Sequence, residues 1–139
     1  MSEISVENFN ALVRNELPWA AETGLYLDKI KYGRATMVLP YQQKSTRPGG
    51  TISGPSMMML SDACMYAVVL SMLGEVKLAV TTNLNINFLR KPSNTDLRAE
   101  GSIIKLGRRL AIIEVSIFSE EDIVSHATGT YSIPPSTVE

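Results

Sequence analysis

The fold is decided by one segment, which reads SGPSMMMLSDACMYAVVLSMLG at residues 53–74. Between its Pro and its final Gly it is long enough for a helix of about four to five turns. Ser53 or Gly54 can cap this helix, and Pro55 suits its first turn because an amide hydrogen is not needed there. Gly74 ends it. The helix is apolar on nearly every side, so we expect other elements to bury it all round.

The segments on both sides of this helix predict strands, two before it and four after it. Apolar and polar residues alternate in several of them, and Gly33 and Gly107 mark turns. A single apolar helix is buried most simply by a curved antiparallel sheet wrapped around it, which is an α+β fold. The predicted strands cover residues 25–27, 35–39, 80–88, 97–106, 108–118 and 123–133.

The length of 139 residues predicts one domain. Residues 1–23 form its N-terminal helical segment, with an amphipathic helix at 6–13 and a second helical turn from Pro18, and residues 134–139 form a frayed tail. A sheet around one helix leaves its edge strands open. We therefore expect these edges to pair between subunits, in a homodimer or homotetramer.

The composition excludes several classes of protein. Thirteen basic and 14 acidic residues give a net charge of −1, which argues against a nucleic-acid binder. One Cys, Cys64, excludes an internal disulfide and fits a reducing compartment. One His, His126, and no ligand cluster exclude the usual metal sites. The N-terminus lacks the features of a signal peptide, and polar residues interrupt the apolar run, so we expect a cytoplasmic protein without a membrane span.

Asp62 is the most informative residue, because its neighbours one helical turn away are mostly apolar. A carboxylate there loses hydration unless another group pairs with it. Two interpretations remain open. Asp62 is either a structural residue that accepts hydrogen bonds from a neighbouring element, or a catalytic base or nucleophile.

The loop before the helix and the first strand after it offer polar partners. Gly54 at the helix start can present its amide to an oxygen that gains negative charge, and the helix dipole adds to this effect. On residues 80–88, Thr81 alternates with apolar residues and shares its face with Asn83, Asn85 and Asn87. This polar face is either exposed to solvent or lines a cleft or subunit interface.

Basic residues are concentrated near the ends of the later strands. Six of the 13 fall between positions 90 and 109. Such residues are either solvated or bind the phosphates of a nucleotide-like ligand. Two adjacent pairs stand at strand ends, namely Arg90–Lys91 and Arg108–Arg109.

Three motifs resemble those of the hotdog-fold acyl-CoA thioesterases of the phenylacetic-acid-degradation type. They are NINFLRKP at 85–92, GRRLA at 107–111 and HATGTY at 126–131. The similarity extends over residues 51–70, 78–92 and 105–131, in the family's order and spacing. The resemblance implies the hotdog fold and hydrolysis of a thioester between CoA and an acyl group, with the CoA thioester as substrate and no cofactor.

The resemblance also implies roles for individual residues. Asp62 is the base or nucleophile, and the Gly54 amide of the same subunit polarises the thioester carbonyl. Thr81 matches a Ser or Thr that the partner subunit contributes in this family. Ser53 and Pro55 stand where the family has His and a second Gly, and Arg47 stands where it often has Asn.

The acyl-CoA then lies in a cleft at the dimer interface. We expect six residues to contact the substrate, in a pocket formed with other Met side chains of the helix, which adapt to many shapes. They are Ser53, Arg47, Pro55, Met58, Asn83 and Tyr66. The two basic pairs are candidates for binding the CoA phosphates. The departures at the helix entrance leave an alternative, a non-catalytic hotdog protein that binds acyl-CoA. A hydratase or dehydratase is disfavoured, because its His would belong near the helix and His126 does not lie there.

Overall fold

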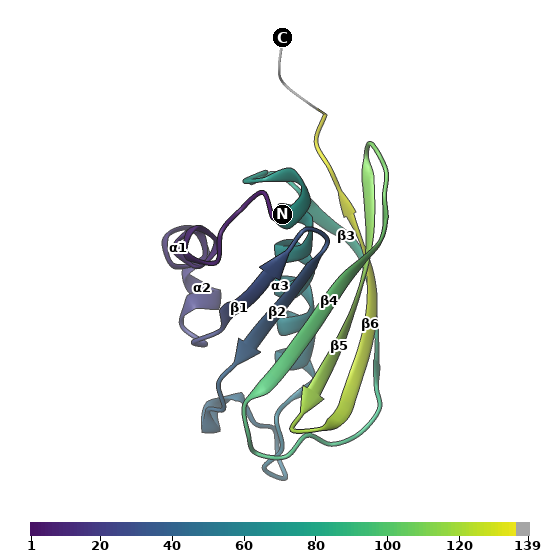
Figure 1. Cartoon of the computed structure of the whole chain (residues 1–139). Helices are drawn as coiled ribbons and strands as arrows, with labels where there is room; N and C mark the ends of the chain where they lie inside the picture. The colour runs from purple at the N-terminus through teal and green to yellow at the C-terminus, as the bar shows by residue number, and fades with distance from the viewer. Residues whose placement is uncertain (136–139) are drawn as a thin grey trace.

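The computed structural model describes residues 1–135 and confirms a curved antiparallel sheet around one long helix (Figure 1). The strand order is β1-β2-β4-β5-β6-β3, and every pair of neighbours is antiparallel. Residues 136–139 of the predicted tail lie outside the described part. The elements are α1 Val6–Glu16, α2 Pro18–Ala21, β1 Tyr26–Lys31, β2 Arg34–Leu39, the 3-10 turn η1 Gln43–Ser45, α3 Gly54–Leu73, β3 Val80–Phe88, β4 Leu97–Leu106, β5 Leu110–Ser119 and β6 Asp122–Ser132.

The predicted signals at both ends of α3 are confirmed. The Ser53 hydroxyl accepts a hydrogen bond from the Ser56 amide at 3.2 Å, which makes Ser53 the N-cap. Gly74 ends the helix with a φ of 79°, a value that favours Gly. By length and composition α3 could cross a membrane, but 56% of its most apolar window is buried inside the fold. It is not buried all round, because Met58 is 41% exposed.

The sheet packs closely on α3 where its strands carry Gly. A Cβ at Gly101 would lie 2.9 Å from Cys64 Sγ, and one at Gly129 would lie 2.5 Å from Met65 Sδ. Both sulfur atoms therefore occupy space that a side chain on the sheet would need. Cys64 and Met65 are completely buried, so the core of the molecule lies between the sheet and this face of the helix.

A bulge in β3 changes which residues share a face. The register between β3 and β6 shifts between Thr81 and Asn83, so that Thr81 pairs with buried Tyr131 and Asn83 pairs with Thr130. Thr81 therefore faces α3, while Asn83, Asn85 and Asn87 are exposed on the opposite face of the sheet. The prediction that Thr81 shares a face with the three Asn residues is wrong, because the pattern in the sequence does not mark the bulge.

The two edges of the sheet differ. At β1, the Leu27 amide donates to Asn10 Oδ1 at 2.8 Å, and Asn10 Nδ2 donates to the Leu27 carbonyl at 3.1 Å. Helix α1 thus occupies hydrogen-bonding groups that an edge strand would otherwise leave free. At β3, no other strand within residues 1–135 pairs with the outer edge. The open edge of this sheet is β3.

Candidate active site

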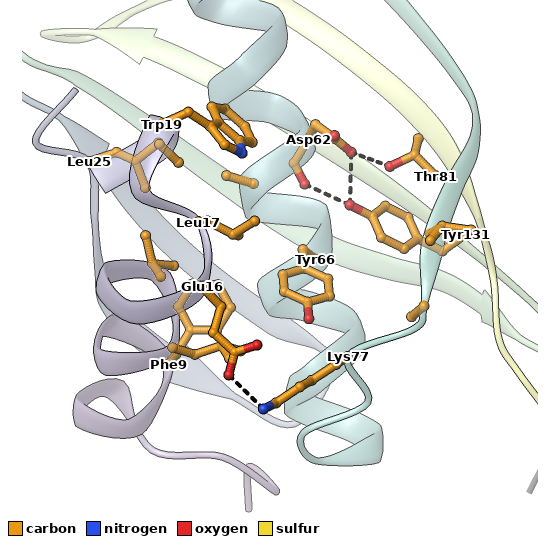
Figure 2. A pocket seen from close by; sticks show the side chains of 16 residues that line it. Phe9, Glu16, Leu17, Trp19, Leu25, Asp62, Tyr66, Lys77, Thr81 and Tyr131 are labelled. Carbon is orange, nitrogen blue, oxygen red and sulfur yellow. Dashed lines mark hydrogen bonds and ion pairs between the residues drawn. The ribbon is translucent and has the colours of Figure 1, made fainter. Parts of the chain in front are cut away.

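The Asp62 carboxylate lies on α3 and is held by two hydroxyl groups from the sheet (Figure 2). Thr81 Oγ1 donates to Asp62 Oδ1 at 2.6 Å, and the Tyr131 hydroxyl donates to the same oxygen at 2.8 Å. The Tyr131 hydroxyl also lies 3.1 Å from the backbone oxygen of Asp62. Within the described chain, Asp62 Oδ2 accepts no hydrogen bond from a side chain. One oxygen is therefore fixed and the other is free to meet water or a ligand.

Tyr131 is a site residue that the sequence did not reveal. It is 3% exposed, and burial together with the nearby Asp62 charge raises the pKa of its phenol well above the usual value. The phenol therefore keeps its proton, and remains a donor, throughout the neutral range. Tyr131 meets Asp62 only through the pairing of β6 with β3 and the packing of α3 on the sheet, which no local pattern specifies.

The chain that carries Asp62 also supplies Thr81. The resemblance had implied that this hydroxyl comes from the partner subunit, and the 2.6 Å hydrogen bond inside one chain corrects that expectation. The bulge in β3 is the physical reason, because it turns Thr81 from the exposed face of the sheet toward the helix.

A cavity opens beside the Asp62 carboxylate, between α3 and the N-terminal helices (Figure 2). We call it the Asp62 cavity. Its volume is about 350 Å³, near the lower end of the range for small-molecule sites. Its walls are mostly apolar and aromatic. It is lined by Phe9, Leu12, Val13, Glu16, Leu17, Trp19, Ala20, Leu25, Asp62, Ala63, Tyr66, Lys77, Ala79, Val80, Thr81 and Tyr131.

Gly54 is the first residue of α3 and lies at the N-terminus of the helix. Among residues 1–135 its amide donates no hydrogen bond, as expected for the first turn of a helix. The ring of Phe88 lies over it, and a Cβ at this position would be 3.2 Å from Phe88 Cζ. Eight residues separate Gly54 from Asp62, which corresponds to about 12 Å along the helix axis.

Other predicted substrate residues lie outside the Asp62 cavity. Ser53, Pro55 and Met58 belong to the Gly54 end of α3, and Arg47 lies in the exposed loop before it. Asn83 faces away from the helix. Tyr66 is the exception, because its ring lines the cavity beside Asp62. The expected pocket of Met side chains is not found there, since Met57 and Met65 are buried core residues.

The four predicted phosphate-binding residues do not meet within one chain. Arg90 and Lys91 follow the end of β3, and Arg90 lies 3.3 Å from Asp122. Arg108 and Arg109 lie in the turn between β4 and β5, beside the start of β3. The length of the strand separates the two pairs by about 30 Å. Their role in binding CoA stays a prediction.

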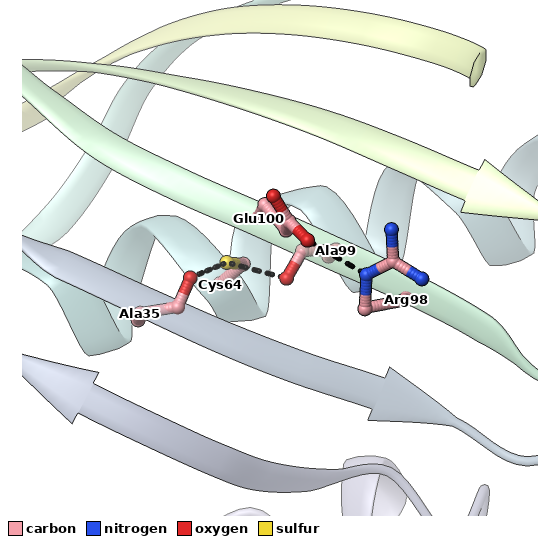
Figure 3. A network of polar contacts seen from close by, with 5 residues as sticks. All are labelled: Ala35, Cys64, Arg98, Ala99 and Glu100. Carbon is pink, nitrogen blue, oxygen red and sulfur yellow. Dashed lines mark hydrogen bonds and ion pairs between the residues drawn. The ribbon is translucent and has the colours of Figure 1, made fainter. Parts of the chain in front are cut away.

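Cys64 and His126 are not part of this site. The Cys64 sulfur lies between the backbone oxygens of Ala35 and Ala99, at 3.6 and 3.8 Å (Figure 3). Burial raises the pKa of its thiol to about 12, so it is no nucleophile at neutral pH. His126 Nε2 lies 3.1 Å from Glu114 on the opposite face of the sheet. In the described part of the chain, no cluster of His, Cys, Asp and Glu suits a metal.

Comparison with known proteins agrees with this fold. The profile of the thioesterase superfamily matches residues 49–126, more than half of the chain, and the chain therefore belongs to that superfamily. A crystal structure of a candidate thioesterase from Silicibacter sp. TM1040 is 41% identical, with a TM-score of 0.88 over 97% of this chain and 95% of that chain. The fold is thus the hotdog fold of thioesterases.

Two further relatives are more distant. A protein of Saccharolobus solfataricus named as a candidate esterase is 29% identical over 94% of this chain and 86% of its own. A mutant of the phenylacetic acid degradation protein PaaI from Thermus thermophilus is 22% identical over 84% of this chain and 99% of that chain, with a TM-score of 0.77. At this identity the second relative supports the fold alone.

Proposed function

We propose that this protein is an acyl-CoA thioesterase of the phenylacetic-acid-degradation type. It hydrolyses the thioester of an aryl- or medium-chain acyl-CoA to the free acid and CoA. The observation that carries the proposal is the Asp62 carboxylate, which two hydroxyl donors fix at the edge of an apolar cavity. A carboxylate in this setting is suited to act on water or directly on a carbonyl group.

The free oxygen of Asp62 performs the chemistry. As a general base, Oδ2 takes one proton from water while the water oxygen attacks the carbonyl carbon, and the carbon–sulfur bond then breaks to release CoA as a thiol after protonation. As a nucleophile, Oδ2 attacks the carbon itself, CoA leaves, and water hydrolyses the resulting anhydride. In both routes, Thr81 and Tyr131 hold the carboxylate through Oδ1.

The Gly54 amide is the proposed oxyanion donor. An unpaired N–H at a helix N-terminus can donate to the carbonyl oxygen as negative charge develops on it. On one helix the amide lies about 12 Å from Asp62, which is too far for both groups to act easily on one thioester. We therefore propose that the two groups acting on one thioester come from two copies of the chain, which revises the expectation that a single subunit supplies both.

The open edge of β3 supports this arrangement. At its start, Thr81 contacts Asp62, and at its end, Phe88 covers Gly54. If β3 pairs with the β3 of a second copy about a twofold axis, the strands are antiparallel and the Phe88 end of one copy meets the Thr81 end of the other. Gly54 of one copy then lies near Asp62 of its partner. The proposed assembly is a homodimer, or a tetramer of two such dimers.

The same pairing of β3 with a second copy changes which basic residues lie close together. It brings Arg90 and Lys91 of one copy to the end of the sheet where Arg108 and Arg109 of the other copy lie. We propose that these residues, brought together only in the dimer, bind the phosphates of CoA.

The test of this function is release of free CoA thiol from a panel of phenylacetyl-, benzoyl-, butyryl- and octanoyl-CoA. Asn in place of Asp62 keeps an oxygen that accepts from Thr81 and Tyr131, so Asp62→Asn preserves the fold but loses the carboxylate. We expect wild-type turnover and a loss of about 10²- to 10⁴-fold in kcat for Asp62→Asn. Equal rates for both proteins would refute the role of Asp62. Tight binding without turnover would favour the non-catalytic alternative.

A further inference from the structure

The N-terminal segment, α1 with α2, builds one wall of the Asp62 cavity. Phe9, Leu12 and Val13 of α1 and Trp19 of α2 line it together with Tyr66 of α3, and the rings of Phe9 and Tyr66 pack with their centroids 6.0 Å apart. Trp19 is 58% exposed although it is a large aromatic residue, which places it at the rim rather than in the core. An apolar cavity that opens beside a catalytic carboxylate is a site for the apolar part of the substrate.

The size of the cavity limits what it can hold. At about 30 Å³ for each non-hydrogen atom, as for water in the liquid, 350 Å³ accommodates roughly ten to twelve atoms. An octanoyl or arylacetyl group has about this size, and a long fatty acyl group is too large. The sequence had indicated Met side chains of α3 as the wall, and the structure instead has a wall that comes from α1 and α2.

The charges around the cavity are the second observation. Its charged lining residues are Glu16, Asp62 and Lys77, so Lys77 is the one cation that lines it in the described chain. Lys77 Nζ lies 2.6 Å from Glu16 Oε2 and 3.6 Å from Glu75 Oε2. Two carboxylates thus neutralise this ammonium group, at the end of the cavity away from Asp62 (Figure 2).

We infer that the α1–α2 segment is the specificity element of this site, and that Glu16, by holding Lys77, makes the cavity accept uncharged acyl groups and reject those that end in a carboxylate. The inference rests on the proposed function, since it concerns the acyl group of the same substrate. A terminal carboxylate would leave bulk water for a largely apolar cavity that offers it no free cation in the described chain. At the Lys77 end, the carboxylates of Glu16 and Glu75 already pair with the ammonium group and would repel it.

Binding of two thioethers that cannot be hydrolysed tests this inference separately from turnover. S-octyl-CoA ends in a methyl group, and S-(7-carboxyheptyl)-CoA has a carboxylate at the same end. Titration calorimetry on the full chain should give S-octyl-CoA a Kd lower by about 30-fold or more. Equal affinities for the two thioethers, or binding of neither at millimolar concentration, would overturn the inference.

Three variants identify the residues responsible. Glu16→Gln frees Lys77 from its shorter contact and should reduce the preference for S-octyl-CoA about fivefold, whereas Lys77→Gln should not reduce it. Glu7→Gln, an exposed change on the same helix but outside the cavity, is the matched control. It should leave the ratio of the Kd values for the two thioethers unchanged. Trp19→Ala should weaken the binding of S-octyl-CoA more than the binding of S-ethyl-CoA. If Glu16→Gln leaves the ratio of the two Kd values unchanged, the inference is contradicted.

The ion pair is half exposed on both sides, at 50% and 47%, so its loss should cost little stability and Glu16→Gln should fold. Hydrolysis of butyryl- and octanoyl-CoA by the same preparations tests the proposed function. Selective binding with no hydrolysis would refute the thioesterase and support the specificity element. Hydrolysis with no selectivity in binding the two thioethers would support the thioesterase and refute the specificity element.

Discussion

Asp62 interrupts an apolar helix, and the structure shows both the cost of this position and what offsets it. Two hydroxyl donors compensate the lost hydration of Oδ1, and Oδ2 accepts no side-chain hydrogen bond within residues 1–135, on a residue that lines the cavity. The structural and catalytic interpretations of this residue are therefore compatible. The structural hydrogen bonds fix the group whose second oxygen is available for reaction.

We expect Tyr131 to act as a positioning residue for Asp62 through its hydrogen bond to Oδ1, and Tyr131→Phe tests this. The change removes one hydrogen bond to an ionised group, which is worth about 1.5–3 kcal/mol, so kcat should fall by about 10- to 100-fold. KM for octanoyl-CoA should change little, because the ring remains in the cavity wall. Steady-state kinetics of thiol release separates the two parameters. A folded variant with kcat within a factor of two of wild type would refute the role, and Thr81→Ser, which keeps its hydroxyl, is the control.

Cys64 makes stability depend on pH in the alkaline range. Burial raises the pKa of its thiol in the folded protein from the ordinary value of 9.0 to about 12. The contribution of this thiol to the free energy of unfolding is therefore complete below pH 9 and is lost as the pH rises toward 12. Over that window the unfolded chain releases the thiol proton and the folded chain keeps it, which lowers stability by about 1.4 kcal/mol per pH unit at most. Urea unfolding at pH 8–11 should show a steeper decline for wild type than for Cys64→Ala. Parallel declines would contradict this account.

At the scale of elements, α3 is the part that the sequence predicted best. Its N-cap, its Pro in the first turn and its terminal Gly are local signals, and all three were confirmed. β4 matches the predicted residues 97–106 as well. In both cases the residues that determine the element lie within it or next to it.

The site was less predictable because it depends on contacts between distant residues. The bulge that turns Thr81 inward leaves no mark in the alternation of residues 80–88. The cavity wall requires α1 to dock beside β1, through Asn10 and Leu27, 17 residues apart. Asp62 and Gly54 could be singled out because a polar residue in an apolar helix and a Gly at a helix entrance are visible locally.

The cap of α3 provides a test at this scale. Ser53→Ala removes the acceptor for the Ser56 amide and should lower the free energy of unfolding by about 0.5–2 kcal/mol. Ser53→Asn keeps a capping side chain and should lower the free energy of unfolding only slightly. Urea unfolding monitored by circular dichroism measures both. A loss as large for Ser53→Asn as for Ser53→Ala would show that Ser53 contributes something other than the cap.

In the whole molecule, the proposed active site depends on β3. This strand carries contacts to Asp62 at one end and to Gly54 at the other, and its outer edge is unpaired within residues 1–135. On the opposite edge, Asn10 of α1 occupies the amide and the carbonyl of Leu27. The asymmetry favours association through β3, and association through this edge completes the proposed active site.

A mixed dimer shows whether the active site is built from two copies of the chain. Gly54→Pro removes the oxyanion amide, and the backbone accepts Pro at the helix start because Ser53 before it has an extended conformation with ψ of 155°. Alone, this variant should lose about 10²- to 10³-fold in kcat. Gly54→Ala, which adds a Cβ 3.2 Å from Phe88 Cζ but keeps the amide, is the control for Gly54→Pro. Asp62→Asn removes the carboxylate. The two variants are co-expressed with different tags, and the mixed dimer is purified through both tags.

In the shared site proposed here, the mixed dimer contains one intact site, with Gly54 from one chain and Asp62 from the other. Its rate of thiol release from octanoyl-CoA should be about half that of the wild-type dimer, since one of two sites is complete. If each chain forms its own site, both sites of the mixed dimer carry a lesion. A rate no higher than that of the parent variants would contradict the account.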